Sequence, residues 1–286
     1  MRYNFRALAG AAIVAGCLSL ISAVPAQSAT LDCTVTAGTC TGGTAVPGVP
    51  GLYSFAGALW TTTDLQATGS GVIDPFVRLS ASTDIVSGMN TSGALNQDEN
   101  PSPTFTHDLN ASAVPVVTIN GLTYYEFLLD INQTGSDPLL SLSSLSLCVS
   151  DTGNRTITAT AEICTLAAGQ GGGAGPSQLV YNLDAGANNT VELNYLFNSG
   201  SGSGDLFVYI PTSSLVNSPG DFMYLFSSFG GTGTTPGLNN DNDGFEEWAV
   251  RTVTSPPTQI PDGGATLTLL GLALSGIGVA RRFMNS

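Results

Sequence analysis

Short segments in which apolar and polar residues alternate run through most of the chain, and turn residues separate them. A period of two residues is typical of β-strands with one buried face, and almost no segment has the period of an amphipathic helix. The pattern predicts strands at residues 52–60, 72–79, 114–119, 123–131, 139–149, 156–163, 178–183, 190–197, 206–210, 222–229 and 247–253. Because the intervals are short, we expect an all-β body of antiparallel strands, arranged as a β-sandwich or jelly roll.

Two local signals refine this prediction. Asn120-Gly121 lies between the apolar runs VVTI and LTYYEFLLDI, and Asn-Gly supplies the two positive φ angles of a type I′ hairpin turn. In residues 139–149 leucines alternate with serines, but the doubled Ser143-Ser144 interrupts the alternation. A β-bulge inserts one extra residue in this way, so we expect a bulge at the two serines.

The first 29 residues have the organisation of a secretory signal peptide. Arg2 and Arg6 precede an apolar stretch at residues 7–23, which we expect to form the signal helix, and small residues follow it. The alternative is a lipoprotein, because the sequence VAGC ends at Cys17. The apolar stretch continues past Cys17, however, which favours export by the Sec machinery and cleavage by signal peptidase.

The last 27 residues have three parts. The first consists of Ile260, Pro261, Asp262, Gly263 and Gly264, which break regular structure. The second is an uncharged apolar run at residues 265–280, which as a helix would be about 24 Å long. A permanent span takes about 20 residues, so we expect a C-terminal transmembrane helix that is a transient anchor. The third part contains Arg281 and Arg282, which the positive-inside rule places in the cytoplasm.

This order of parts resembles the PEP-CTERM sorting signals of Gram-negative bacteria, in the variant written V-P-D-S-G or V-P-D-G-G. Ile260 stands in place of the usual Val, and Gly263 in place of the second Pro of the commoner form. The resemblance implies that exosortase, a membrane cysteine peptidase, recognises the tail and removes it as the body moves to the cell surface. The mature protein would then lack its hydrophobic tail.

These features divide the chain into five parts. We expect a signal peptide at residues 1–29, a loose N-terminal arm at 30–50, the β-sandwich body at 51–253, a linker at 254–259 and the sorting signal at 260–286. The expected route leads through the inner membrane to the cell surface or the extracellular space.

The body is strongly acidic. Of the 21 Asp and Glu residues all but Asp262 lie between the signal peptide and the sorting signal, where the only basic residues are Arg78, Arg155 and Arg251, which leaves a net charge of about −17 for the arm, body and linker together. Such a charge repels phosphate backbones and excludes nucleic acid as a partner. Divalent cations, and neutral sugars bound by Asp, Asn and aromatic side chains, are the compatible partners.

Four cysteines remain after removal of the signal peptide: Cys33, Cys40, Cys148 and Cys164. An even number in an exported chain predicts two disulfides, with three possible connectivities. We favour Cys33 with Cys40 and Cys148 with Cys164. A tight hairpin at residues 151–154 would nevertheless separate the second pair by about 23 Å along the strand. Either that turn is broader or the pairing is not local.

Several catalytic motifs are absent from the sequence. The chain has no lysine, which excludes a Walker loop and a Schiff base. His107 is the only histidine, which excludes a zinc motif of the H-E-x-x-H type, and no G-x-S-x-G elbow accompanies it. Glu246 and Glu247 are poor candidates for a glycosidase pair, because neighbours on a strand point to opposite faces. We therefore expect no catalytic residue, and a solvated loop position for His107.

One acidic segment, residues 239–248, matches the first half of a calcium-binding loop. Asn239, Asp241 and Asp243 place alternate side-chain oxygens around one ion, and Glu246 is a further candidate ligand. The match fails at the twelfth position, where an EF-hand has Glu and this chain has Val250. A calcium site of another type and a turn in which Asx side chains bond their own backbone both remain open, and the turn is favoured.

Two functional hypotheses follow. The first is a non-enzymatic surface or matrix protein, released by exosortase and associated with extracellular polysaccharide. The second is a calcium-dependent carbohydrate-binding module or glycan-active enzyme, which would use the loop at residues 239–247 and aromatic side chains such as Tyr124, Trp60 or Trp248.

Overall fold

The computed structural model describes residues 28–63, 73–80, 83–95, 97–156, 164, 176–198, 204–215, 221–231, 241 and 244–252. The predicted signal helix, the predicted transmembrane helix and nearly all of the strand predicted at 156–163 lie outside these residues. Within the described ranges, no helix is long and apolar enough to cross a membrane.

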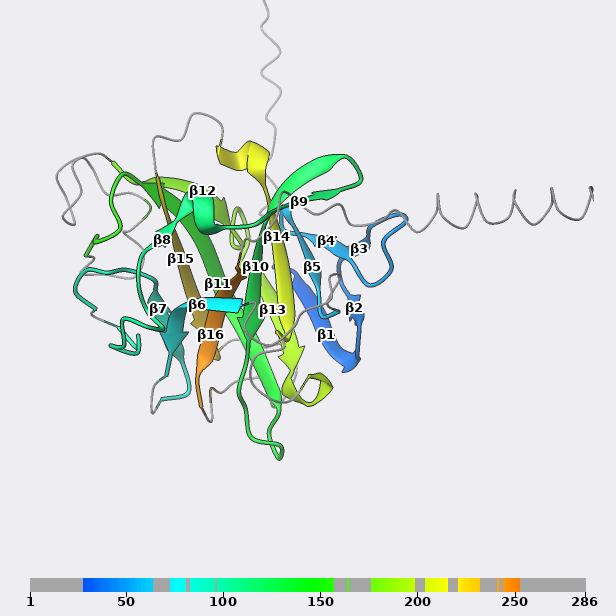
Figure 1. The fold of residues 1–286 in the computed structure, drawn as a ribbon. Coiled ribbons are helices and arrows are strands. Elements are labelled where there is room, and N and C mark those ends of the chain that lie inside the picture. Colours follow the sequence, from blue (N-terminus) through cyan, green and yellow to red (C-terminus); the bar gives the residue numbers. More distant parts are fainter. Residues whose placement is uncertain are drawn as a thin grey trace, which may run out of the picture.

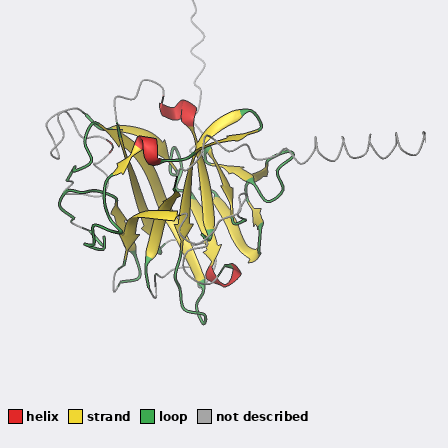
Figure 2. Ribbon diagram, in the orientation of Figure 1, coloured by secondary structure: helices red, strands yellow, loops and turns green. Residues whose placement is uncertain are grey.

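The described body is all-β and consists of two eight-stranded sheets, as the sequence predicts (Figures 1 and 2). Sheet A contains β1 (Thr30–Thr36), β2 (Thr39–Thr41), β7 (Val86–Met89), β8 (Leu109–Asn110), β11 (Leu139–Ser150), β12 (Gln178–Asn182), β13 (Thr190–Asn194) and β15 (Phe222–Phe229). Sheet B contains β3 (Thr44–Ala45), β4 (Tyr53–Phe55), β5 (Ala58–Thr61), β6 (Ile73–Leu79), β9 (Val116–Ile119), β10 (Leu122–Asp130), β14 (Leu206–Pro211) and β16 (Glu246–Arg251). The helical segments among the described residues are the short 3-10 turns η1 (Ala111–Ala113), η3 (Tyr195–Phe197) and η4 (Thr212–Leu215).

Four neighbouring strands of each sheet are connected as in a jelly roll. Sheet A contains the order β13-β11-β15-β7 and sheet B the order β14-β10-β16-β6, and all of these pairs are antiparallel. The chain crosses from one sheet to the other at almost every step between these strands. Neighbours within a sheet therefore come from distant parts of the sequence, which is the connectivity of two combined Greek keys.

The main core lies between the two sheets. Fully buried Leu142 of sheet A belongs to the same apolar cluster as Phe127 and Trp248 of sheet B. Along β16, Trp248 and Val250 belong to this cluster, whereas Glu247 lies on the opposite face. The alternation in the sequence thus corresponds to inward and outward positions.

The N-terminal segment is part of the sheets, so the expectation of a loose arm at residues 30–50 is wrong. Strand β1 pairs in parallel with β13, and Leu31 and Cys33 of β1 are fully buried. A disulfide joins Cys33 to Cys40 of β2, with 4.1 Å between the Cα atoms. Burial of apolar side chains against a distant strand, together with the disulfide, fixes this segment.

The predicted hairpin at Asn120-Gly121 is confirmed. The two residues have φ angles of 50° and 79° and connect β9 to β10 directly. A second hairpin of the same kind divides the single strand predicted at residues 52–60. There Ala56 and Gly57 have φ angles of 46° and 81° between β4 and β5. Alanine rarely adopts a positive φ, which is why this turn was not recognised in the sequence.

The serine-rich strand β11 has the predicted bulge and the predicted disulfide. Its register against β15 shifts between Leu142 and Ser144. Cys148 is joined to Cys164, with 5.2 Å between the Cα atoms, so both local pairings are confirmed. The neighbour of β11 at this position is β12, where Leu179 lies opposite Cys148. The turn after β11 is therefore the broader one of the two alternatives.

Candidate functional site

A row of charged side chains crosses four neighbouring strands at one end of sheet B. The register places Arg78 of β6 opposite Glu247 of β16, and Glu247 opposite Asp130 of β10. The ladder between β10 and β14, continued by one residue, places Asp205 opposite Asp130. Residues opposite one another in a sheet share one face, and here it is the face turned away from the main core. We call Glu247, Asp130 and Asp205 the acidic row.

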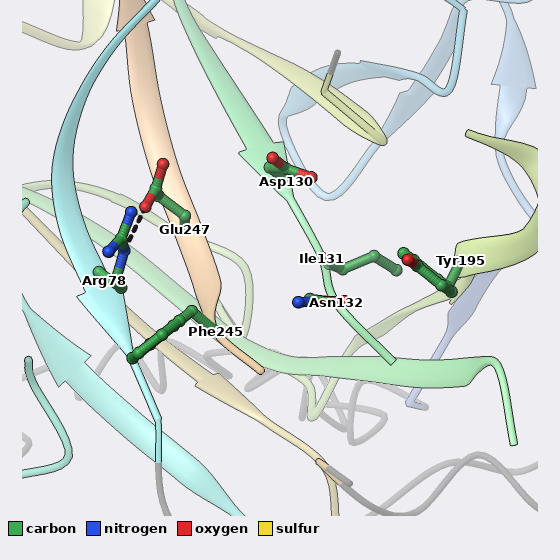
Figure 3. A pocket seen from close by; sticks show the side chains of 7 residues that line it. All are labelled: Arg78, Asp130, Ile131, Asn132, Tyr195, Phe245 and Glu247. Atoms are coloured by element: carbon green, nitrogen blue, oxygen red, sulfur yellow. Dashed lines mark hydrogen bonds and ion pairs between the residues drawn. The ribbon is translucent and has the colours of Figure 1, made fainter. Parts of the chain in front are cut away.

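Arg78 holds one end of the row. Its Nε donates a hydrogen bond to the Glu247 carboxylate (Figure 3). Its guanidinium lies 3.2 Å from the centroid of the Phe105 ring and 4.9 Å from that of the Phe245 ring. Burial raises the pKa of Glu247, an effect that Arg78 opposes and Asp130 increases. The guanidinium is therefore fixed beside the first carboxylate of the row.

Asp205 lies at the other end and is only 6% exposed. Its Oδ2 accepts a hydrogen bond from the backbone N–H of Ile131 at 2.8 Å, and its carboxyl group is also hydrogen-bonded to the Asp130 side chain. Burial, together with the neighbouring Asp130 carboxylate, raises the pKa of Asp205 to about 8. Two carboxyl groups thus face each other on adjacent strands, which favours a neutral form of one of them.

A small pocket opens beside the row (Figure 3). It holds about 90 Å³ and is lined by Arg78, Asp130, Ile131, Asn132, Tyr195, Phe245 and Glu247. The lining comes from the ends of β6 and β10, the start of β16 and the turn η3. Charged groups, an amide and two aromatic rings therefore surround a space suited to part of a small ligand and not to a whole drug-sized molecule.

Glu246 lies behind the row, on the opposite face of β16. It is fully buried, and its carboxylate accepts hydrogen bonds from Gln133 Nε2 at 2.8 Å and from the backbone N–H of Asn132 at 3.3 Å. Burial, and secondarily the charge of Asp241, raise its pKa well above the ordinary range. Because Glu246 and Glu247 face opposite sides of the strand, they cannot act on one bond, as the sequence predicts.

The predicted calcium ligands are described only in part. Asn239 and Asp243 lie outside the described residues, whereas Asp241 lies near enough to Glu246 to affect its pKa. Gly244 has the positive φ of 75° that the sharp turn requires. In the described ranges, no group of three Asp, Glu, His or Cys side chains is arranged to bind a metal ion. The calcium site stays a prediction.

The aromatic side chains expected to contact sugar are not available for it. Trp60 and Trp248 are fully buried, and Tyr124 is buried in a second apolar cluster on the outer face of sheet B. Each lies on a strand of sheet B, where the sequence did not distinguish buried from exposed faces. Phe245, which is 38% exposed, and half-buried Tyr195 are the aromatic residues of the pocket.

His107 is more buried than the solvated loop residue that the sequence predicts. It lies in a loop but is half-buried, and its Nδ1 and Nε2 lie 2.7 Å and 3.1 Å from the carbonyl oxygens of Asp108 and Pro75. His107 does not line the pocket, so we do not assign it to the candidate site.

Comparison with known proteins identifies the end of the chain. Residues 259–284 match the model of the VPDSG-CTERM motif, which confirms the predicted sorting motif of the PEP-CTERM type. No curated protein and no solved structure matches the chain significantly. The motif residues Ile260, Pro261, Asp262, Gly263, Gly264, Arg281 and Arg282 lie outside the residues that the structure describes.

Proposed function

We propose that this chain is an exported, non-enzymatic surface or matrix protein that exosortase releases from a transient C-terminal anchor and that associates with extracellular polysaccharide. The observation that carries the proposal is the VPDSG-CTERM motif at residues 259–284. The expected export by the Sec machinery and the cleavage by signal peptidase precede this step. The disulfides of β1–β2 and β11 agree with an oxidising location outside the cytoplasm.

The charge of the body supports an uncharged or cationic partner. The three arginines of the body are each in an ion pair, Arg78 with Glu247, Arg155 with Asp151 and Arg251 with Glu126. With about 17 excess negative charges, the body repels nucleic acid and anionic polymers.

Mass spectrometry of the released protein tests the sorting. We expect a C-terminus near Asp262 in cells with exosortase, and an uncleaved, membrane-bound chain when exosortase is absent or when Asp262→Ala alters the motif. Asp84→Ala, which changes an exposed carboxylate of the body, is the matched control and should leave cleavage unchanged. Released protein that still contains Arg281 and Arg282 would contradict the proposal.

The second candidate function is calcium-dependent binding or processing of carbohydrate. It is favoured by the proximity of Asp241 to the fully buried Glu246, together with Asn239 and Asp243 in the same loop. A calcium ion with these ligands would compensate carboxylates that burial otherwise disfavours.

Thermal or urea unfolding with calcium and with EDTA tests the metal site. An ion that binds only the folded state at 100 times its Kd should add about 2.7 kcal/mol to the free energy of unfolding. Asp241→Asn should remove this gain, and Asp221→Asn, at an exposed position before β15, should keep it. Identical unfolding curves with calcium and with EDTA would eliminate the calcium site.

A further inference from the structure

We infer that the pocket beside the acidic row binds one edge of a neutral sugar unit directly, without a metal ion. Arg78, Glu247 and Asn132 bond the hydroxyl groups of this unit, and the ring of Phe245 packs against its apolar face. The inference rests on the proposed association with extracellular polysaccharide and identifies the class of sugar and the surface that contacts it.

The first argument is the hydrogen-bonding capacity that the ion pair of Arg78 and Glu247 retains. The pair uses one nitrogen and one oxygen, because Arg78 Nε donates to Glu247 Oε2. Among the described residues, the two terminal nitrogens of Arg78 and Oε1 of Glu247 have no hydrogen-bond partner. Both residues line the pocket, with 19% and 16% of their side chains accessible. A sugar hydroxyl accepts one hydrogen bond and donates another, so it can bond the guanidinium and the carboxylate together.

The second argument is the amide of Asn132, which also lines the pocket. Asn132 is exposed, and its side chain has no hydrogen-bond partner in the described part of the chain. Its position is nevertheless fixed. The backbone N–H donates to Glu246 at 3.3 Å, and the side chain lies so close to Gly244 that a Cβ there would be 2.2 Å from Nδ2. The amide offers donors and an acceptor, which are the groups that bond neighbouring hydroxyls of a sugar.

The third argument is the ring of Phe245. The Arg78 guanidinium lies over this ring, 4.9 Å from its centroid, and also over the Phe105 ring, which holds the guanidinium in place. Phe245 is still 38% exposed, and Figure 3 shows Asn132 between Phe245 and Tyr195. The C–H groups on the face of a sugar ring carry partial positive charge and pack on an aromatic face, while the hydroxyl groups lie around its edge. An aromatic ring beside hydrogen-bonding groups matches this distribution.

The size of the pocket limits how much of the ligand it holds. Its volume of about 90 Å³ lies well below the roughly 300 Å³ of a pocket that encloses a whole small molecule. The pocket therefore takes the edge of one sugar unit, and the rest of the polysaccharide lies in solvent. We expect a weak single contact, with a Kd of about 1 mM, which repeated units and many protein copies on one polymer strengthen.

Other classes of ligand fit less well. An anionic sugar would meet the carboxylates of Glu247 and Asp130, while Arg78 is already in an ion pair. A divalent cation needs several ligands around one point, and the described residues contain no such group of Asp, Glu, His or Cys. A wholly apolar ligand would cover the polar side chains without replacing their hydrogen bonds to water. A neutral sugar supplies these hydrogen bonds and adds no charge.

Calorimetric titration of the purified exported protein tests the inference. The ligands are short oligomers of glucose, galactose and mannose, each compared with the uronic-acid oligomer of the same sugar. We expect at least one neutral oligomer to bind with a Kd of about 1 mM, at least tenfold more tightly than its uronic-acid counterpart, and EDTA to leave this affinity unchanged. Failure of all three neutral oligomers to bind, equal binding of the uronic acids, or loss of binding in EDTA would overturn the inference.

Variants of the lining assign the binding to the pocket. Glu247→Gln should lower the affinity about tenfold, and Asn132→Ala and Phe245→Ala should each lower it several-fold. The matched controls are Asn188→Ala and Leu179→Ala, which remove an exposed amide and an exposed apolar side chain outside the pocket and should change nothing. Urea unfolding of each variant shows that it is folded. Unchanged affinity in the three pocket variants would place the sugar elsewhere and refute the site.

Co-sedimentation with polysaccharide isolated from the producing cells separates this inference from the proposed function. Phe245→Ala should co-sediment less than the wild type. Equal co-sedimentation of the two proteins would refute the pocket and keep the association with polysaccharide. Binding of a neutral oligomer at the pocket without any co-sedimentation would refute the association and keep the pocket.

Discussion

Arg251→Met is expected to lower the free energy of unfolding of the body by about 3 kcal/mol or more. Arg251 Nε donates a hydrogen bond to Glu126 Oε1 at 2.6 Å, and the two residues are 7% and 0% exposed. The guanidinium also lies 5.3 Å from the centroid of the Phe207 ring. Methionine keeps much of the packing volume but removes the positive charge, so a buried carboxylate loses the cation that stabilises it. Urea unfolding, followed by tryptophan fluorescence, measures the loss.

Two further variants separate the charge from the packing. Arg251→Met combined with Glu126→Gln removes both charges and should regain most of the lost stability, because replacing both partners of a buried pair is tolerated far better than removing one. Arg78→Met removes a partly exposed partner, with 19% of its side chain accessible, and should cost only about 1 kcal/mol. Equal losses for Arg251→Met and Arg78→Met would contradict the assignment of Arg251 to a buried ion pair.

Much of the fold could be predicted from the sequence because it depends on local alternation. β10, β11, β14 and β15 carry long runs of period two, and each lies within two residues of its predicted bounds. β7 and β8 were missed because they are short, with only four and two residues. Strand β1 was missed although TLDCTVT alternates, because its partner β13 is distant in the sequence: Thr30 pairs with Thr190. Local pattern cannot indicate a distant partner.

The candidate site could be predicted only in fragments, for the same reason. Asp130 and Asp205 each stand at the end of a predicted strand, and a carboxylate at a strand end is an ordinary feature of a sequence. They become a site only because the register of β10 against β14 places them opposite each other. The register also decides that Trp60 and Trp248 face the core while Phe245 reaches the pocket. Only the opposite orientation of Glu246 and Glu247 on β16 could be predicted, because adjacent residues of a strand face opposite sides of the sheet.

The second large effect that we expect is a dependence of the free energy of unfolding on pH, which comes from the acidic row. Burial beside Asp130 raises the pKa of Asp205 from 3.8 to about 8, so the folded protein retains a proton that the unfolded chain releases at lower pH. A raised folded-state pKa contributes stability that is complete below pH 3.8 and is lost as the pH rises through about 8. At about 1.4 kcal/mol per pH unit, even half of this shift would cost about 3 kcal/mol at alkaline pH. The free energy of unfolding of the wild-type body should therefore fall from about pH 4 to about pH 8 and level off above that.

Asp205→Asn should remove most of this dependence. The amide oxygen can still accept the hydrogen bond from Ile131, and the amide N–H₂ supplies a donor toward Asp130, as the protonated acid does. We expect the variant to match the wild type within about 0.5 kcal/mol at acidic pH and to be more stable by about 2–3 kcal/mol above pH 8, by urea unfolding across the pH range. Asp84→Asn removes an exposed carboxyl group and should follow the wild-type curve. Parallel curves for Asp205→Asn and the wild type would show that the row is not the source of the pH dependence. It would then follow that a cation or water, and not a proton, balances the charge of Asp205 in the folded protein.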